Sequence, residues 1–149
     1  MFSSLATAPL DEPKSVTGLF AENLATNSTP EWWLAENYPG TNDFNNAALS
    51  DTDGDGMRAW QEYVANTQPT NANSKLAITR AQSIRGTNYL ISWQSVATDR
   101  HYSVYWGTHL RNSLAPLATN LDGTPPENSY TDATHSAETN IFYRIQVRK

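Results

Sequence analysis

Four carboxylates fall within one short run of the sequence, at a spacing that lets them converge on a single cation. The run is "DTDGDGMRAWQE", which begins at Asp51, and the other acidic groups are Asp53, Asp55 and Glu62. Like charges this close repel one another, so the arrangement needs an opposite charge to offset the repulsion. Calcium takes six to eight oxygen ligands, and alternate side chains along a tight loop can supply them. The spacing therefore predicts a calcium site.

The pattern D-x-D-x-D-G-x5-E is that of the calcium loop of an EF-hand. Asp51, Asp53 and Asp55 take the places of the first three side-chain ligands, Met57 offers its backbone carbonyl, and Glu62 closes the site with both carboxylate oxygens. The alternative is a surface turn rich in aspartate and glycine that binds nothing. A glutamate at the correct offset, on a segment with its own helical pattern, favours the metal site.

Two positions differ from a paired EF-hand and bear on affinity. Arg58 stands where paired loops carry an aliphatic residue that bridges to a partner loop, and Ala59 has no side-chain oxygen, so water must fill that ligand position. A solitary loop of this kind is expected near the extracellular-module range of about 10⁻⁴–10⁻³ M. Cytosolic calcium would rarely fill so weak a site, which favours a secreted protein with a structural ion over a sensor.

Three short helices are predicted around the loop. The first covers 30–38, with Thr29 as its N-cap and Pro30 in its first turn, and the second follows Asp43 as its cap. The third is "MRAWQEYVAN", which begins at Met57 and has Asn66 as a plausible C′ residue. Its apolar stripe of Trp60, Tyr63 and Val64 is too large for so small a unit to bury alone. We expect it to be shared between Trp33 or Leu34 and the near edge of whatever follows.

From residue 75 the pattern changes to short strands. "KLAITRA", "NYLISWQSV", "HYSVYWG", "NSYTDA" and "NIFYRIQVRK" are rich in β-branched and aromatic residues and are separated by turn-forming stretches. Five to seven strands in so short a segment predict a small antiparallel sandwich. The fold class is therefore α+β in two parts, with a linker or loosely ordered arm at 1–28, a helical EF-hand-like calcium unit at 29–74 and a β-sandwich at 75–149.

Composition excludes several classes of function. The chain has 149 residues and a net charge of −5 without a dense basic patch, so neither nucleic acid nor an anionic membrane is an expected partner. There is no cysteine, and no apolar run approaches the roughly 20 residues that span a bilayer. The first residues lack the features of a signal peptide. The chain is therefore either cytosolic or a piece of a larger secreted protein.

Four aromatic residues are the candidates for a ligand other than a metal: Trp32, Tyr105, Trp106 and Phe142. Trp32 and Trp33 point about 100° apart on a helix, so one can enter the core while the other stacks on a sugar ring. Core packing, or isolated exposure without a function, is the competing interpretation. The three histidines show no metal-binding or catalytic spacing, and no nucleophile or phosphate motif is present, so we expect no enzyme.

The run from residue 29 to 74 resembles a calcium-binding segment found near the C-termini of large secreted bacterial proteins, related in its loop to dockerins and thrombospondin type 3 repeats. The likeness rests on the Trp-Trp-Leu helix, the aspartate-rich loop, "WQEY" and an exit that here reads "NTQPTNANS", with Gln68 in place of the usual aspartate. Residues 75–149 resemble a fibronectin type III-like module, through "ISWQSVATDRHYSVYWGTHL" and "FYRIQV". Dockerins have two loops, so a single loop does not imply binding to a cohesin.

The resemblance implies an accessory module in the same polypeptide as an upstream catalytic domain, outside the cell and often acting on polysaccharide. Our leading hypothesis is a non-catalytic, calcium-stabilised spacer that is monomeric. The main alternative is a carbohydrate-binding module that uses the exposed aromatics, and a small hydrolase is the third. Glycan binding would separate the first two hypotheses, and turnover that survives removal of calcium would favour the third.

Overall fold

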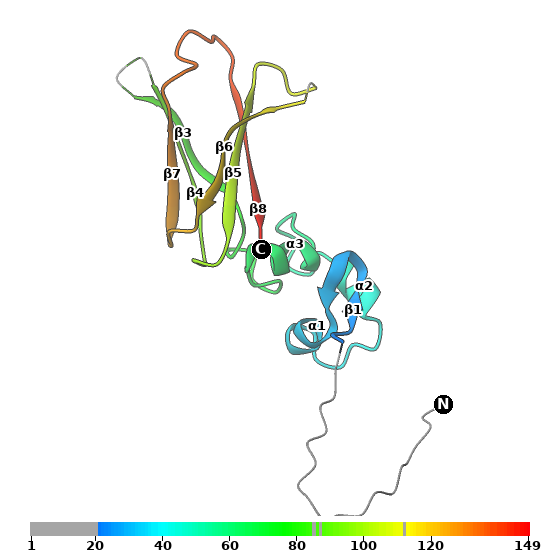
Figure 1. Ribbon diagram of the computed structural model, residues 1–149. Helices are drawn as coiled ribbons and strands as arrows, with labels where there is room; N and C mark the ends of the chain where they lie inside the picture. Colours follow the sequence, from blue (N-terminus) through cyan, green and yellow to red (C-terminus); the bar gives the residue numbers. More distant parts are fainter. Residues whose placement is uncertain (1–20, 85, 87, 112) are drawn as a thin grey trace, which may run out of the picture.

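The computed structural model describes residues 21–149 except 85, 87 and 112, so most of the arm expected at 1–28 lies outside the described residues. The described chain is mostly antiparallel β-structure with a few short helices (Figure 1). In this part of the chain, no helix has the length and apolar character needed to cross a membrane. The elements in chain order are β1 (Leu24–Ala25), η1 (Thr26–Ser28), β2 (Thr29–Pro30), α1 (Glu31–Asn37), α2 (Phe44–Leu49), α3 (Ala59–Ala65), β3 (Ile78–Ile84), β4 (Asn88–Gln94), β5 (His101–Gly107), β6 (Ala115–Asp122), β7 (Glu127–Asp132) and β8 (Phe142–Arg148).

The start of α1 differs from the sequence prediction. Thr29 does not cap the helix, because its backbone pairs with Ala25 in the β1–β2 ribbon and its hydroxyl donates to the Thr26 carbonyl at 2.9 Å. The residue before α1 is Pro30, which makes no side-chain capping bond. The ribbon also shows that ordered packing in the helical half begins before residue 29.

Two other predicted helix ends are confirmed, at Asp43 and at Asn66, whereas α3 begins at Ala59 and not at Met57, whose N–H donates to the Asp55 side chain in the loop. The Asp43 side chain accepts a hydrogen bond from the Asn46 backbone N–H at 3.0 Å and caps α2. α3 ends at Asn66, whose φ of 61° places it in the left-handed region that commonly terminates helices. At the other end of α3, the Arg58 N–H donates to the Gln61 side chain at 2.8 Å. The acidic run therefore lies between two helices, each of which has defined end residues.

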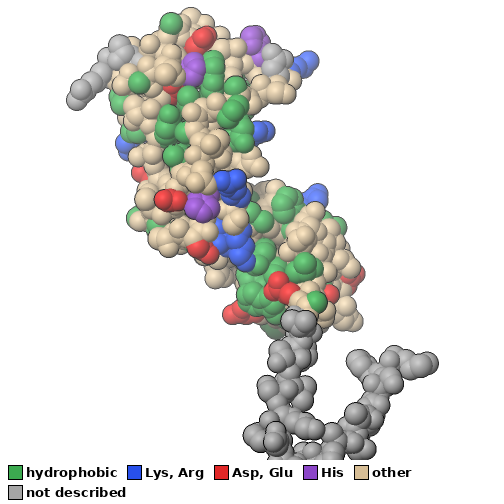
Figure 2. All heavy atoms as spheres, viewed as in Figure 1, with side chains coloured by type: hydrophobic (Ala, Val, Ile, Leu, Met, Phe, Trp, Pro, Cys, Tyr) green, Lys and Arg blue, Asp and Glu red, His purple; other side chains and the backbone are tan. Residues whose placement is uncertain are grey.

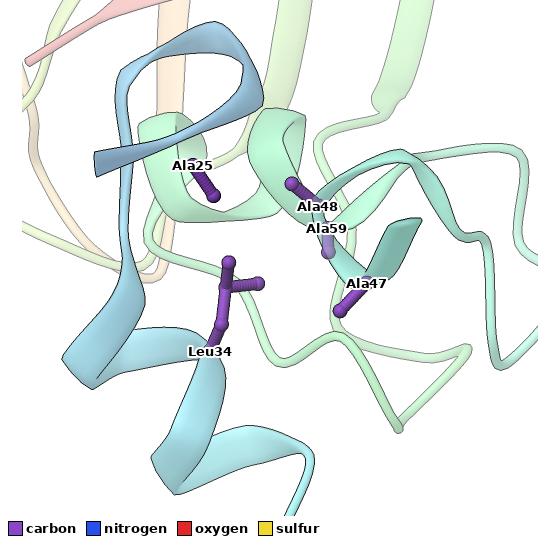
Figure 3. Packing of buried hydrophobic residues seen from close by; sticks show 5 residues of the cluster. All are labelled: Ala25, Leu34, Ala47, Ala48 and Ala59. Atoms are coloured by element: carbon purple, nitrogen blue, oxygen red, sulfur yellow. The ribbon is translucent and has the colours of Figure 1, made fainter. Parts of the chain in front are cut away.

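A small core of mostly alanine side chains holds the helical half together. Leu34 is fully buried against Ala25, Ala47, Ala48 and Ala59, which come from β1, α2 and α3 (Figure 3). Side chains this small let the helices approach closely but bury little apolar area. Larger rings complete the packing at the edge of this core, namely Trp33, Tyr38 and Phe44.

Two three-stranded sheets make up the other half, with strand orders β3-β4-β7 and β6-β5-β8. They pack face to face around Ile91 and Trp93 of β4 and Tyr102 and Val104 of β5, all at most 1% exposed. The rings of Trp93 and Tyr102 lie 5.7 Å apart. These inward positions agree with the sequence pattern. The period-two alternation of β8 is also confirmed, since Tyr143, Ile145 and Val147 pack on this core.

Strand β6 has no counterpart among the five runs singled out in the sequence. It carries Pro116 and also Asn120, whose φ is 59°, and it has no aromatic side chain. All three features weaken a strand pattern. β6 exists as an edge strand because β5 pairs with it, with register shifts that accommodate the irregular residues.

Helix α3 lies between the two halves (Figure 1). One face carries Tyr63, whose ring meets Trp33 edge-on at 5.4 Å, while Trp60 and Val64 line a cavity of about 320 Å³ against Ile145 and Val147 of β8. The expectation that the apolar stripe is shared with the edge of the sheets is confirmed. The helical half therefore uses the sheets to cover a surface that it cannot bury alone.

A buried carboxylate fixes the loop after β7. Asp132 is fully buried and accepts hydrogen bonds from the Thr134 backbone, the Thr134 hydroxyl, His135 and the Tyr143 hydroxyl, at 2.8–2.9 Å. His135 in turn stacks on Trp106, with ring centroids 3.4 Å apart. Burial acts to raise the pKa of Asp132, but the hydrogen bonds together outweigh it and hold the pKa below its usual value.

We predict that Asp132→Asn destabilises the protein by about 2 kcal/mol or more at neutral pH, because it weakens bonds to a buried charge. An Asp with a lowered folded-state pKa contributes fully above its unfolded pKa of about 3.9, and the contribution is lost as pH falls through the folded value. Urea unfolding should therefore show the gap between wild type and variant shrinking below about pH 4. Glu138→Gln in the same loop is the control and should leave stability unchanged.

Candidate metal centre

Three carboxylates of the acidic run come together in the structure. Asp51, Asp53 and Asp55 each place an oxygen within 4.8 Å of the others, in the loop between α2 and α3. Asp51 is exposed, whereas Asp53 and Asp55 are half-buried. The prediction that alternate aspartates converge is confirmed for these three side chains. Glu62, the fourth predicted ligand, is not within that 4.8 Å group.

Backbone hydrogen bonds hold the aspartates in place. Asp51 accepts from the N–H groups of Gly54 and Gly56, at 2.9 and 3.1 Å. Both glycines have positive φ, 76° and 96°, a conformation that side chains with a Cβ rarely adopt. The Asp55 N–H donates to Asp53, and the Met57 N–H donates to Asp55. Hydrogen bonds within the loop therefore orient the three aspartate side chains.

Two carboxylate oxygens in the loop are buried without a partner. Oδ1 of Asp53 and of Asp55 accept the loop N–H groups, but Oδ2 of each is buried and has no hydrogen-bond partner among the described residues. Burying a charged oxygen without a hydrogen bond or an opposite charge is strongly unfavourable. A cation bound in the loop could satisfy both oxygens.

Glu62 lies in α3 and is only 1% exposed. Burial is the main cause that raises its pKa to about 8; the charges of Asp53, Asp55 and Asp51 add to this, and a hydrogen bond from Thr67 opposes it. Burial and the three neighbouring acids therefore make the ionised form of Glu62 less stable than its protonated form. A divalent cation changes that balance, because it favours the ionised form.

Thr67 was not anticipated from the sequence. Its hydroxyl donates to Glu62 Oε1 at 3.3 Å, and its backbone N–H donates to the Glu62 carbonyl at 3.0 Å. Met57, predicted to offer its carbonyl, turns its side chain toward the sheets, where the Sδ atom accepts the Leu76 N–H at 3.2 Å. A polar residue just past the end of a helix is too common a signal to have identified Thr67.

Trp32 is the exposed member of its pair, with 56% of its surface accessible, whereas Trp33 packs on the core. Trp32 lines a cavity of about 380 Å³ together with Glu22, Glu31 and Phe44. Its indole N–H donates to Glu22. The exposed ring of Trp32 and two carboxylates therefore lie beside one cavity.

The other three aromatic candidates do not form one patch. Trp106 lies on the inner face of β5 with Tyr102 and Val104, and it is covered by His135. Tyr105 and Phe142 lie on the outer face of the same sheet, by their register with Arg144 and Gly107. The Arg144 guanidinium covers the Tyr105 ring at 4.7 Å, so a sugar could stack there only if that side chain moved.

No family model, curated protein or solved structure matches this chain. Any proposal about function must therefore be argued from the residues of this chain. Among the described residues, the side chains that converge in the loop are Asp51, Asp53 and Asp55, and no histidine belongs to that group. The donor set of the loop consists of oxygens alone, which suits a hard cation such as calcium or magnesium.

In the presence of a chelator, we predict that Glu62→Gln becomes more stable relative to wild type as pH rises. The unfolded glutamate ionises near pH 4.3, whereas the folded one keeps its proton until about pH 8, so folding of the wild type weakens across that interval. Glutamine carries no such proton. Denaturant unfolding at pH 5 and pH 8 measures the change, with exposed Glu36→Gln as the matched control. A constant difference between Glu62→Gln and wild type would contradict the assigned burial.

Proposed function

We propose that this chain is a non-catalytic accessory module in which calcium, bound by the acidic loop, stabilises the helical half and its junction with the sheets. The observation that carries the proposal is the buried Glu62 carboxyl beside three aspartates. Four acids in and beside one loop, with two orphaned oxygens, are hard to explain as a surface turn that binds nothing. The assignment as an EF-hand-like calcium unit is part of this proposal.

Each predicted ligand has a role in that site. Asp51, Asp53 and Asp55 supply carboxylate oxygens from the loop, and the Met57 carbonyl follows them. Glu62 closes the site from the first turns of α3, with Thr67 orienting its carboxylate. Calcium is favoured over magnesium, because magnesium keeps most of its water and is seldom held by a cage of many protein carboxylates.

The wider role follows from the sheets and from the resemblance described above. The face between the two sheets is filled by Trp93, Tyr102 and their neighbours, which leaves a packed body rather than a reaction chamber. A fibronectin type III-like spacer outside the cell, attached to a catalytic domain that acts on polysaccharide, accounts for such a body. Extracellular calcium is abundant enough to fill a solitary site of modest affinity.

Calcium is expected to raise the melting temperature. A ligand at 100 times its dissociation constant stabilises by about 2.7 kcal/mol, which in a domain of this size corresponds to roughly 5–10 °C. Thermal unfolding should be followed by circular dichroism in calcium and in chelator. The Glu62→Gln variant should lose most of the shift, and Glu36→Gln should keep it. Superimposable wild-type melts would refute the calcium proposal.

Trp32 supports a second candidate, a carbohydrate-binding module. Its exposed ring, with Glu22 and Glu31 beside the same cavity, offers a stacking face and hydrogen-bond acceptors for hydroxyl groups. Affinity electrophoresis in gels that contain soluble polysaccharides tests this directly. If the module binds sugar here, wild type is retarded and Trp32→Ala is not. Retardation that depends on Tyr105 or Phe142 instead would place the site on the outer face of the β6-β5-β8 sheet.

A further inference from the structure

The sheets hold α3 near both of its ends. Before its first turn, the Met57 sulfur accepts the backbone N–H of Leu76, which leads into β3. Near its last turn, Lys149 lies over the Tyr63 ring at 4.2 Å and donates to its hydroxyl. Residues of the sheet half therefore hold the helix that carries Glu62 both before its first turn and near its last turn.

Arg100 makes the most specific of these contacts. It precedes β5 and is only 2% exposed. Its Nε donates to the Val64 carbonyl at 2.6 Å and its Nη2 to the Tyr63 carbonyl at 3.2 Å. The remaining Nη1 pairs with the exposed carboxylate of Asp99 at 2.6 Å. One planar guanidinium thus bridges two carbonyls in the last turn of a helix.

Those carbonyls are natural partners for a cation. The last four carbonyls of an α-helix lack intrahelical donors and carry the negative end of the helix dipole. In α3, the Glu62 carbonyl is satisfied by Thr67, and Arg100 takes the carbonyls of Tyr63 and Val64. A buried guanidinium that lost these acceptors would be left without enough partners, so Arg100 stabilises one position of α3 over others.

We infer that Arg100 is a positioning residue that links metal occupancy of the acidic loop to the orientation of the sheets, by anchoring the C-terminal end of α3. This inference rests on the proposed calcium site. Metal bound at Glu62 and the loop fixes the start of α3, and a helix this short moves as a rigid rod. Arg100 then fixes the sheets to the other end of that rod.

Thermodynamic linkage makes the inference measurable. Suppose that the contact of Arg100 with α3 and the binding of calcium favour the same arrangement of the two halves. Because such coupling is reciprocal, removing the Arg100 contact must then weaken calcium binding. We expect Arg100→Gln to raise the calcium dissociation constant about fivefold or more, although Arg100 is not a metal ligand. Arg100→Lys, which keeps the charge but lacks the planar fork that matches both carbonyls, should fall between wild type and Arg100→Gln.

The test uses isothermal titration with calcium on the full chain, with Arg80→Gln on the exposed strand β3 as the matched control. Residual dipolar couplings of wild type and of Arg100→Lys then report whether the sheets reorient relative to α3. A dissociation constant and couplings unchanged from wild type in both Arg100 variants would overturn the inference while leaving the calcium site intact. A purely structural role would lower thermal stability without changing calcium affinity.

Wild-type protein alone provides a second measurement if the substitutions prevent folding. Solvent exchange of the Arg100 Nε–H, followed by NMR, should slow when calcium is added, because the metal holds α3 against its partner. Exchange that is the same in calcium and in chelator would contradict the linkage. Absence of any calcium binding by wild type would instead overturn the proposed function, so the two failures can be told apart.

Discussion

The repulsion among the aspartates of the loop before α3 and the buried Glu62 is the main constraint on the helical half. Asp53 and Asp55 each bury an oxygen without a partner, and the nearby Glu62 is almost fully buried as well. The alanine-rich core around Leu34 contributes little apolar area to oppose such a penalty. A cation in the loop would offset the repulsion among these carboxylates and would stabilise the helical half.

α3 serves both halves at once, which explains its composition. Tyr63 meets Trp33 within the helical half, whereas Trp60 and Val64 face β8. A unit this small cannot bury three large apolar side chains by itself, and the sheets provide the second surface. Because the carbonyls at the end of α3 also receive Arg100, the junction combines apolar packing with directional hydrogen bonds. Directional bonds define one orientation, which apolar packing alone does not.

In the polar cluster around Asp132, hydrogen-bond donors stabilise a buried carboxylate. There a fully buried carboxylate is surrounded by donors from Thr134, His135 and Tyr143, and its pKa is lowered. Among the described residues, Glu62 receives one such bond, from Thr67, and its pKa is raised. The two acids differ in how many donors surround them and in their neighbouring charges. This contrast is why we propose a metal ligand at Glu62 and a structural role for Asp132.

The sequence by itself determined the local features of this protein. The aspartate spacing predicted the convergence of Asp51, Asp53 and Asp55, Asp43 and Asn66 marked helix ends, and period-two alternation identified the inward side chains of β4, β5 and β8. All of these depend on residues close together in the chain, where turn geometry and side-chain periodicity decide the outcome.

Only the tertiary structure decided the features that join distant residues. Thr29 entered a ribbon instead of capping α1, and β6 formed because β5 was available to pair with it. The contact of Arg100 with the end of α3 spans 36 and 37 residues of sequence, and no local pattern encodes it. Long-range pairing depends on which surfaces meet in space, and that follows from the packing of the whole chain rather than from the spacing of neighbours.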